Sequence, residues 1–148
     1  MSFSKTFHVR WGDMDFNAHM KNTAFLDLSA DVRRMCFAEN GFPMSEFERL
    51  RIGPVILRDE LDYYRELHLL ETLTVDLALA GLSDEGSRFR FRNRFFRPDG
   101  KPAATVTSLG GWLDLDRRKL ASPPGPLKEL LDRLERTDDF EVLASSLR

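Results

Sequence analysis

A short polar stretch near the start of the chain contains most of the residues suited to chemistry on a substrate. Residues 11–22, WGDMDFNAHMKN, carry two carboxylates, one imidazole and two amides: Asp13, Asp15, His19, Asn17 and Asn22. An ionised carboxylate can attack a carbonyl carbon or deprotonate the water that does so. An amphipathic run follows at once, and the free N–H groups of a helix N-terminus can stabilise a developing oxyanion. This combination is typical of a site that handles a carbonyl or binds an ion.

Two other interpretations of the same residues stay open. Asp and Asn side chains before a helix often cap its N–H groups, a contribution of about 1 kcal/mol without any catalytic role. Asp13 is interpreted in this way, as a residue that holds the loop. A metal site is the second alternative, because carboxylates and imidazoles are ligands of zinc and iron. The candidate ligands His8, Asp13, Asp15 and His19 match no metal-site spacing, and we expect neither a metal nor a cofactor.

The element that must position this stretch is a helix over residues 22–40. Apolar residues recur there at helical spacing: Phe25, Leu28, Val32, Met35 and Cys36. Gly41 and Pro43 form a strong stop signal. Cys36 lies on the apolar stripe and is interpreted as a small buried hydrophobe. Residues 42–54 form either an irregular connection or a short helical turn at positions 45–50.

The hydrophobic period then changes from that of a helix to that of strands. We expect strands at residues 5–10, 55–66, 72–80, 87–97 and 101–115, and a closing helix at 127–134. The fourth of these alternates Phe89, Phe91 and Phe95 with arginines, and a bulge is expected at Gly110-Gly111. The last dozen residues remain ambiguous. Short connections favour antiparallel pairing, which predicts an α+β fold with a curled antiparallel sheet wrapped around one long helix.

Size and composition limit the class of protein. At 148 residues the chain is expected to form a single domain, residues 1–148. A net charge of −2 argues against nucleic acid as a partner, and the absence of a long apolar run argues against a membrane. A single cysteine, Cys36, excludes an intramolecular disulfide. We expect a cytoplasmic protein.

The segment from Arg10 to Asn22, with its pattern Asp-x-Asp-x-x-x-His-x-x-Asn, resembles the hotdog-fold acyl-CoA thioesterases. The similarity is greatest to the 4-hydroxybenzoyl-CoA thioesterase group. Two further segments support it, DYYR at residues 62–65 and WLDLDRRKLASP at residues 112–123. The resemblance covers nearly the whole chain, although only the first segment is specific.

The resemblance implies a hotdog fold that hydrolyses an acyl-CoA to the free acid and CoA. Asp15 would be the nucleophile or general base, with the backbone N–H of Asn22 as oxyanion donor and His19 as a positioning group. Tyr64 and Arg65 would contact the substrate. The resemblance further implies a homodimer or homotetramer with sites at the protomer interface and without a cofactor. A non-catalytic acyl or small-ligand binding protein is the alternative, because one fold can support several functions.

The binding of CoA is the least defined part of this prediction. Residues 83–86, SDEG, are acidic where the 4-hydroxybenzoyl-CoA enzyme has a basic cluster for the CoA phosphates. Arg88, Arg90, Arg92 and Arg94 share one strand face, and Arg88 is a candidate phosphate ligand. Cross-strand ion pairs are the favoured interpretation of the face as a whole. Apolar candidates for an acyl pocket, which can equally be core residues, are Phe16, Met20, Phe25, Phe42 and Met44.

Overall fold

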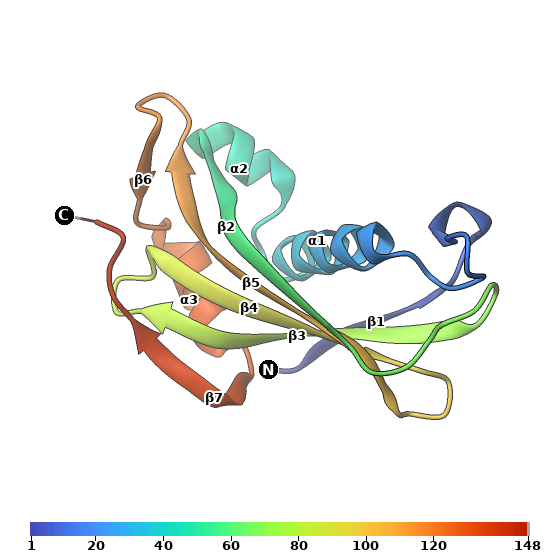
Figure 1. Ribbon diagram of the computed structural model, residues 1–148. Helices are drawn as coiled ribbons and strands as arrows, with labels where there is room; N and C mark the ends of the chain where they lie inside the picture. The colour runs from blue at the N-terminus through green and yellow to red at the C-terminus, as the bar shows by residue number, and fades with distance from the viewer. Residues whose placement is uncertain (148) are drawn as a thin grey trace.

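A computed structural model describes residues 1–147, in which a curled sheet of seven strands holds a long helix against its concave face (Figure 1). The strands are β1 (Phe3–His8), β2 (Ile52–Tyr63), β3 (Thr72–Ser83), β4 (Arg88–Phe96), β5 (Pro102–Asp114), β6 (Lys119–Ala121) and β7 (Arg136–Leu143). The main path of neighbours runs β1-β3-β4-β5-β2, while β6 pairs with β5 and β7 with β3. Every pair is antiparallel except β3–β7. The predicted α+β architecture is confirmed.

Helix α1 (Asn22–Glu39) spans the concave face because one of its sides is apolar. The side chains that it buries include Phe25, Leu28, Val32 and Cys36. The helix ends as the sequence predicts. Gly41 has a left-handed φ of 94°, and the N–H of Phe42 reaches back to the carbonyl of Phe37 at 2.8 Å, a Schellman-type C-cap.

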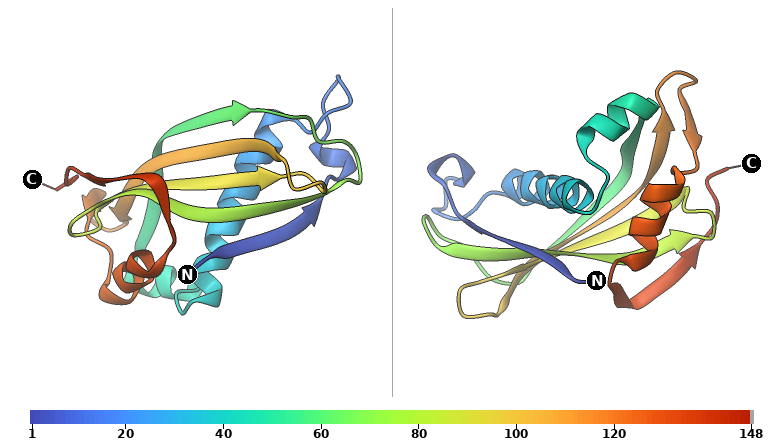
Figure 2. Two further views of the ribbon diagram at one scale, coloured as in Figure 1. Left: turned by 90° about the horizontal axis from the view of Figure 1, so that it is seen from below. Right: turned by 180° about the vertical axis from the view of Figure 1, so that it is seen from behind.

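Two shorter α-helices and one turn of 3-10 helix complete the fold. Helix α2 (Met44–Leu50) is the short helical turn expected after α1, and it lies on the same side of the sheet (Figure 2). Helix α3 (Gly125–Arg133) buries Leu127, Leu130 and Leu131. The 3-10 turn η1 (Trp11–Asp13) begins just after the expected end of the first strand, and β1 lies two residues nearer the N-terminus than predicted.

Strand β4 separates an apolar face from a charged one, as its alternation predicts. Phe89, Phe91 and Phe95 are completely buried on the α1 side. The favoured interpretation of the arginine face is confirmed for three of its members, whose partners lie on β3 and β7. Arg92 pairs with Asp139 of β7 at 2.7 Å, Arg94 with Asp76 of β3 at 2.6 Å, and Arg90 with Glu141 of β7.

The expected irregularity near Gly110-Gly111 lies on the neighbouring strand. The register of β2 against β5 shifts between Ile56 and Arg58, so the extra residue is Leu57. Gly110 is needed for another reason. A Cβ at this position would lie 2.2 Å from the carbonyl oxygen of Val55, so the absence of a side chain permits the two strands to pair.

Strand β7 occupies the region that the sequence left ambiguous. Its charged residues are mostly exposed, and Phe140 is the residue that packs against the core. It adds in parallel to β3, with Gly81 opposite Glu141 and Leu82 opposite Val142. Pairing with β3, and not an apolar face of its own, fixes the conformation of β7. Its sequence therefore shows no clear alternation of apolar and polar residues.

Candidate active site

The loop between η1 and α1 holds Asp15 by hydrogen bonds to its own backbone. The N–H groups of Asn17 and His19 donate to Asp15 Oδ1 at 2.8 and 3.1 Å, and the N–H of Asp15 donates to the carbonyl of His19 at 2.8 Å. Ala18 adopts a left-handed φ of 62° to complete this tight turn. The two N–H groups, with that of His19 contributing most, hold the pKa of Asp15 below its ordinary value. The carboxylate is exposed and ionised at neutral pH.

Asn22 begins α1 directly after this loop. Lys21 is the N-cap residue, and its side chain makes no capping hydrogen bond. The first N–H groups of a helix have no acceptor within the helix, and together they form its positive end. Among the hydrogen bonds formed by residues 1–147, none uses the N–H of Asn22. The structure therefore offers an N–H donor at the start of α1.

Asp13 is confirmed as a structural residue. Its buried carboxylate accepts hydrogen bonds from the backbone N–H and the guanidinium of Arg10, at 2.9 to 3.2 Å. Burial raises the pKa of Asp13, but these hydrogen bonds outweigh it and leave the pKa below its ordinary value. The carbonyl of Asp13 also accepts the N–H of Lys21 at 2.7 Å, which closes the loop onto the start of α1.

A cavity of about 510 Å³ brings the loop together with the end of β2. It is lined by Asp15, His19, Met20, Asn22, Phe25, Tyr63, Tyr64, Arg65, Glu66 and Leu67. Five of the six predicted site residues line it, which joins positions 15–22 to positions 64 and 65. The N–H of Met20 donates to the carbonyl of Leu67 at 2.8 Å and holds the two segments side by side. The apolar part of the wall comes from Met20, Phe25 and Leu67.

A second cavity, of about 750 Å³, adjoins the first across Tyr63, Tyr64 and Arg65. Its other walls are Arg94, Phe96, Pro102, Ala104 and Thr105. Tyr64 is fixed there by a 3.3 Å contact between its hydroxyl and Thr105 Oγ1, and Arg65 by a 2.9 Å hydrogen bond to the carbonyl of Pro102. The exposed Arg65 guanidinium thus stands between two hollows that together could hold an elongated ligand.

Arg88 lies away from this region. It begins β4, whereas Phe96 at the other end of the strand lines the second cavity. The two residues are eight steps apart along the strand, a distance of about 26 Å. Within one chain, Arg88 therefore does not join the other predicted site residues, and its contact with CoA stays a prediction.

Two of the apolar candidates for the acyl pocket also lie elsewhere, since Phe42 is in the core and Met44 lines a separate hollow beside α2. Phe16 is fully exposed.

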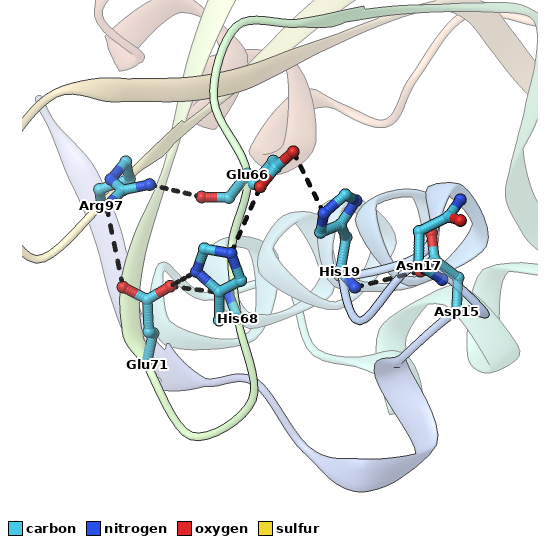
Figure 3. Close-up of polar contacts among 7 residues, drawn as sticks. All are labelled: Asp15, Asn17, His19, Glu66, His68, Glu71 and Arg97. Atoms are coloured by element: carbon cyan, nitrogen blue, oxygen red, sulfur yellow. Dashed lines mark hydrogen bonds and ion pairs between the residues drawn. The ribbon is translucent and has the colours of Figure 1, made fainter.

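The segment between β2 and β3 adds polar residues that the sequence did not single out (Figure 3). Glu66 contacts two imidazoles, with Oε1 3.1 Å from His19 Nε2 and Oε2 3.3 Å from His68 Nε2. Glu71 accepts from His68 Nδ1 at 2.8 Å, and Arg97 donates to the carbonyl of Glu66 at 2.7 Å. No spacing rule links His19 to residues nearly fifty positions away, so this group follows from the folding of the chain.

The metal alternative considered for His8, Asp13, Asp15 and His19 does not correspond to a group of converging side chains. His8 pairs with Thr72 in the sheet, and Asp13 is engaged by Arg10. Over residues 1–147, the group of side chains with the geometry to hold a metal is His19, Glu66 and His68.

None of the helices described over residues 1–147 combines the length and hydropathy needed to cross a membrane.

A curled antiparallel sheet around one long helix, with a polar loop leading into that helix, defines a hotdog fold. Solved structures agree. A Staphylococcus aureus protein in complex with CoA superimposes with a TM-score of 0.83 at 21% identity, covering 93% of this chain and 87% of that one. A 1,4-dihydroxy-2-naphthoyl-CoA thioesterase from Synechocystis gives 0.80 at 15% identity, covering 90% and 98%. A probable thioesterase from Escherichia coli gives 0.75 at 21%, covering 90% and 99%.

The family follows from the sequence itself. Residues 9–134 match the model of the thioesterase-like superfamily, so the chain belongs to this superfamily and is a thioester hydrolase. The resemblance to hotdog-fold acyl-CoA thioesterases is confirmed. A search of curated proteins finds no match.

Proposed function

We propose that this protein hydrolyses an acyl-CoA thioester in the cavity that Asp15 lines, with Asp15 as nucleophile or general base. One observation carries the proposal. Two N–H groups occupy Asp15 Oδ1, while Oδ2 accepts no hydrogen bond from residues 1–147 and remains available in an open cavity. The same two bonds orient the carboxylate and keep it ionised, and both roles require an ionised, oriented carboxylate.

The start of α1 would supply the electrostatic part of the mechanism. Attack on the thioester carbonyl places negative charge on its oxygen, and a preorganised N–H donor stabilises that charge. Asn22 lines the same cavity as Asp15, and its N–H, which has no acceptor among residues 1–147, suits this role. Water adds to the acyl carbon, the C–S bond breaks, and the products are a carboxylic acid and the CoA thiol. His19, fixed through its backbone to Asp15, would position the reacting groups.

The two adjoining cavities suggest how the substrate lies. The acyl group would contact Met20, Phe25 and Leu67 in the first cavity. The pantetheine and nucleotide would leave across Tyr64 and Arg65 into the second. Arg65 uses one N–H donor on Pro102, and the guanidinium has five, so it retains donors for a phosphate oxygen. This arrangement needs no basic residue in the acidic turn at positions 83–86.

We further propose that the protein is a homodimer paired through β2. Among the strands described over residues 1–147, β2 pairs only with β5, which leaves its other edge unpaired. Ile56, Leu57 and Tyr63 are exposed apolar residues of this strand, and an open apolar edge favours pairing with a second copy. Because β2 ends at Tyr63, a partner strand there would lie beside the cavity.

Light scattering after gel filtration tests the dimer. A Leu57→Lys variant places a charge on the β2 edge and should yield monomers. Val142→Lys, at an equally exposed position on β7, is the matched control and should leave the dimer intact. A wild-type monomer at assay concentration, or dissociation by Val142→Lys alone, would contradict pairing through β2.

Release of free thiol tests the chemistry. Wild-type protein should hydrolyse members of a panel of aliphatic and aromatic acyl-CoAs, and Asp15→Asn should lose at least about 100-fold in kcat. Asp138→Asn makes the same charge change at an exposed site on β7 and should retain full activity. Tight acyl-CoA binding without thiol release by the wild type would establish the binding protein instead.

If the wild type is active, single turnover in ¹⁸O-water distinguishes Asp15 as nucleophile from Asp15 as general base, because only a nucleophilic Asp15 acquires the label.

A further inference from the structure

Three side chains from two separate loops converge beside the cavity. His19 comes from the loop before α1, whereas Glu66 and His68 come from the segment between β2 and β3 (Figure 3). One oxygen of Glu66 lies 3.1 Å from His19 Nε2 and the other lies 3.3 Å from His68 Nε2. One potential ligand atom from each residue falls within 4.8 Å of the other two. All three side chains are at least one-third exposed, so an ion can reach them from solvent.

These distances suit a metal ion. Zinc binds imidazole nitrogen and carboxylate oxygen at about 2.0–2.2 Å, which places two tetrahedral ligands about 3.4 Å apart. The nitrogen–oxygen separations of 3.1 and 3.3 Å are close to this length, one to each oxygen of Glu66. A tetrahedral site with one Glu66 oxygen requires the three ligand atoms, which lie within 4.8 Å of one another, to move closer together. Two imidazoles and one carboxylate leave a fourth position open, as in zinc sites with a bound water.

Neighbouring residues orient His68 and Glu66 for metal binding. Glu71 accepts from His68 Nδ1 at 2.8 Å and from the N–H of His68 at 2.7 Å. With Nδ1 directed at Glu71, Nε2 is the ring nitrogen left to bind an ion, and it lies on the side of Glu66 and His19. Arg97 fixes the backbone of Glu66 through its carbonyl. A carboxylate behind a metal-binding histidine is the usual outer shell of a metal site, and its loss weakens metal affinity about 10–100-fold.

We propose that His19, Glu66 and His68 form a binding site for a divalent transition-metal ion, with Zn²⁺ as the preferred occupant. The ligand set of imidazole and carboxylate favours Zn²⁺ over Mg²⁺ or Ca²⁺, which prefer oxygen ligands. The bound ion joins the loop that carries Asp15 to the segment that carries Tyr64 and Arg65, and so rigidifies the mouth of the cavity. The site itself stands on ligand geometry and does not depend on the proposed thioesterase chemistry.

Calorimetric titration of chelator-treated full-length protein with ZnCl₂ tests this site directly. The wild type should bind one Zn²⁺ per chain, and His68→Ala should abolish this binding. Glu71→Gln should weaken it about 10–100-fold, which a purely structural role of Glu71 would not produce. The His8→Ala variant lacks the one histidine of the sequence that lies outside the group, and it should bind Zn²⁺ as the wild type does.

Two further readouts separate metal binding from activity. Co²⁺ should give the intense visible absorption of a tetrahedral site in the wild type and in Asp15→Asn alike. Saturation with Zn²⁺ at a hundredfold excess over Kd should raise Tm by about 5–10 °C in the wild type and leave folded His68→Ala unchanged. Absence of Zn²⁺ binding by the wild type, or equal affinity in His68→Ala, would overturn the proposal even if the thioesterase is active. Circular dichroism checks that each variant is folded.

Discussion

Substitution of Gly110 by alanine should destabilise the protein strongly. The new methyl carbon would lie 2.2 Å from the carbonyl oxygen of Val55 and 2.8 Å from the ring of Phe89. Neither neighbour can move easily, because the Val55 carbonyl belongs to the backbone of a paired strand and the Phe89 ring is completely buried. Strands β2 and β5 must therefore separate by about 1 Å at this point to restore a normal contact.

The magnitude follows from what that separation disrupts. Overpacking a close-packed site costs about 1–3 kcal/mol, and weakening one or two hydrogen bonds of the ladder adds about 0.5–1.5 kcal/mol each. We expect a loss of about 2–4 kcal/mol in the free energy of unfolding. Domains of this size have about 5–15 kcal/mol in total, so the variant should fold but unfold at a markedly lower urea concentration.

The chain offers a graded control for this experiment. A Cβ at Gly53, also on β2, meets nothing within 4 Å, whereas one at Gly111 would lie 3.0 Å from the carbonyl oxygen of Ser87. Urea unfolding should therefore rank Gly53→Ala near the wild type, Gly111→Ala intermediate and Gly110→Ala least stable. Equal midpoints for Gly110→Ala and Gly53→Ala would refute the argument that close approach of β2 and β5 requires a glycine.

Three further outcomes are expected. The lowered pKa of Asp13 gives a stability contribution that is present above about pH 4 and is lost as pH falls through its folded-state pKa; Asp13→Asn should therefore cost about 1 kcal/mol in urea unfolding at pH 7, and the cost should shrink as the pH is lowered below about 4. The lowered pKa of Asp15 should keep the pH profile of kcat/KM flat down to about pH 4, and an acidic limb near pH 6 would assign the activity to another group. Arg65→Ala should raise KM for acyl-CoA about tenfold with kcat nearly unchanged, and should have no effect with a thioester that lacks the nucleotide.

Local sequence signals predicted the framework well. The apolar stripe from Phe25 to Cys36 and the stop at Gly41 determined α1 within one residue at each end. The alternation around Phe91 determined which face of β4 is buried. These features were accessible because helix and strand periods are properties of neighbouring residues. Cys36 is buried as predicted, and burial raises the pKa of its thiol to about 11.

Features that depend on distant contacts were not predicted. Strand β7 lacks an apolar face of its own and is ordered by pairing with β3 and by the arginines of β4. The bulge at Leu57 depends on how β2 matches β5, which no local pattern states. Glu66, His68 and Glu71 gained significance only because the N–H of Met20 pairs with the carbonyl of Leu67.

The sequence by itself determined that Asp15 stands in a polar loop before a long helix, and its spacing to His19 and Asn22 indicated the class of chemistry. It also separated Asp15 from Asp13, whose role as a loop residue the structure confirms. Only the tertiary structure decided which side chains share a cavity with Asp15. It brought the predicted Tyr64 and Arg65 to that cavity, added Glu66 and His68 beside His19, and left Arg88 at the far end of β4. The physical reason is that spacing along the chain fixes local geometry, whereas a cavity is made by segments that sheet pairing brings together.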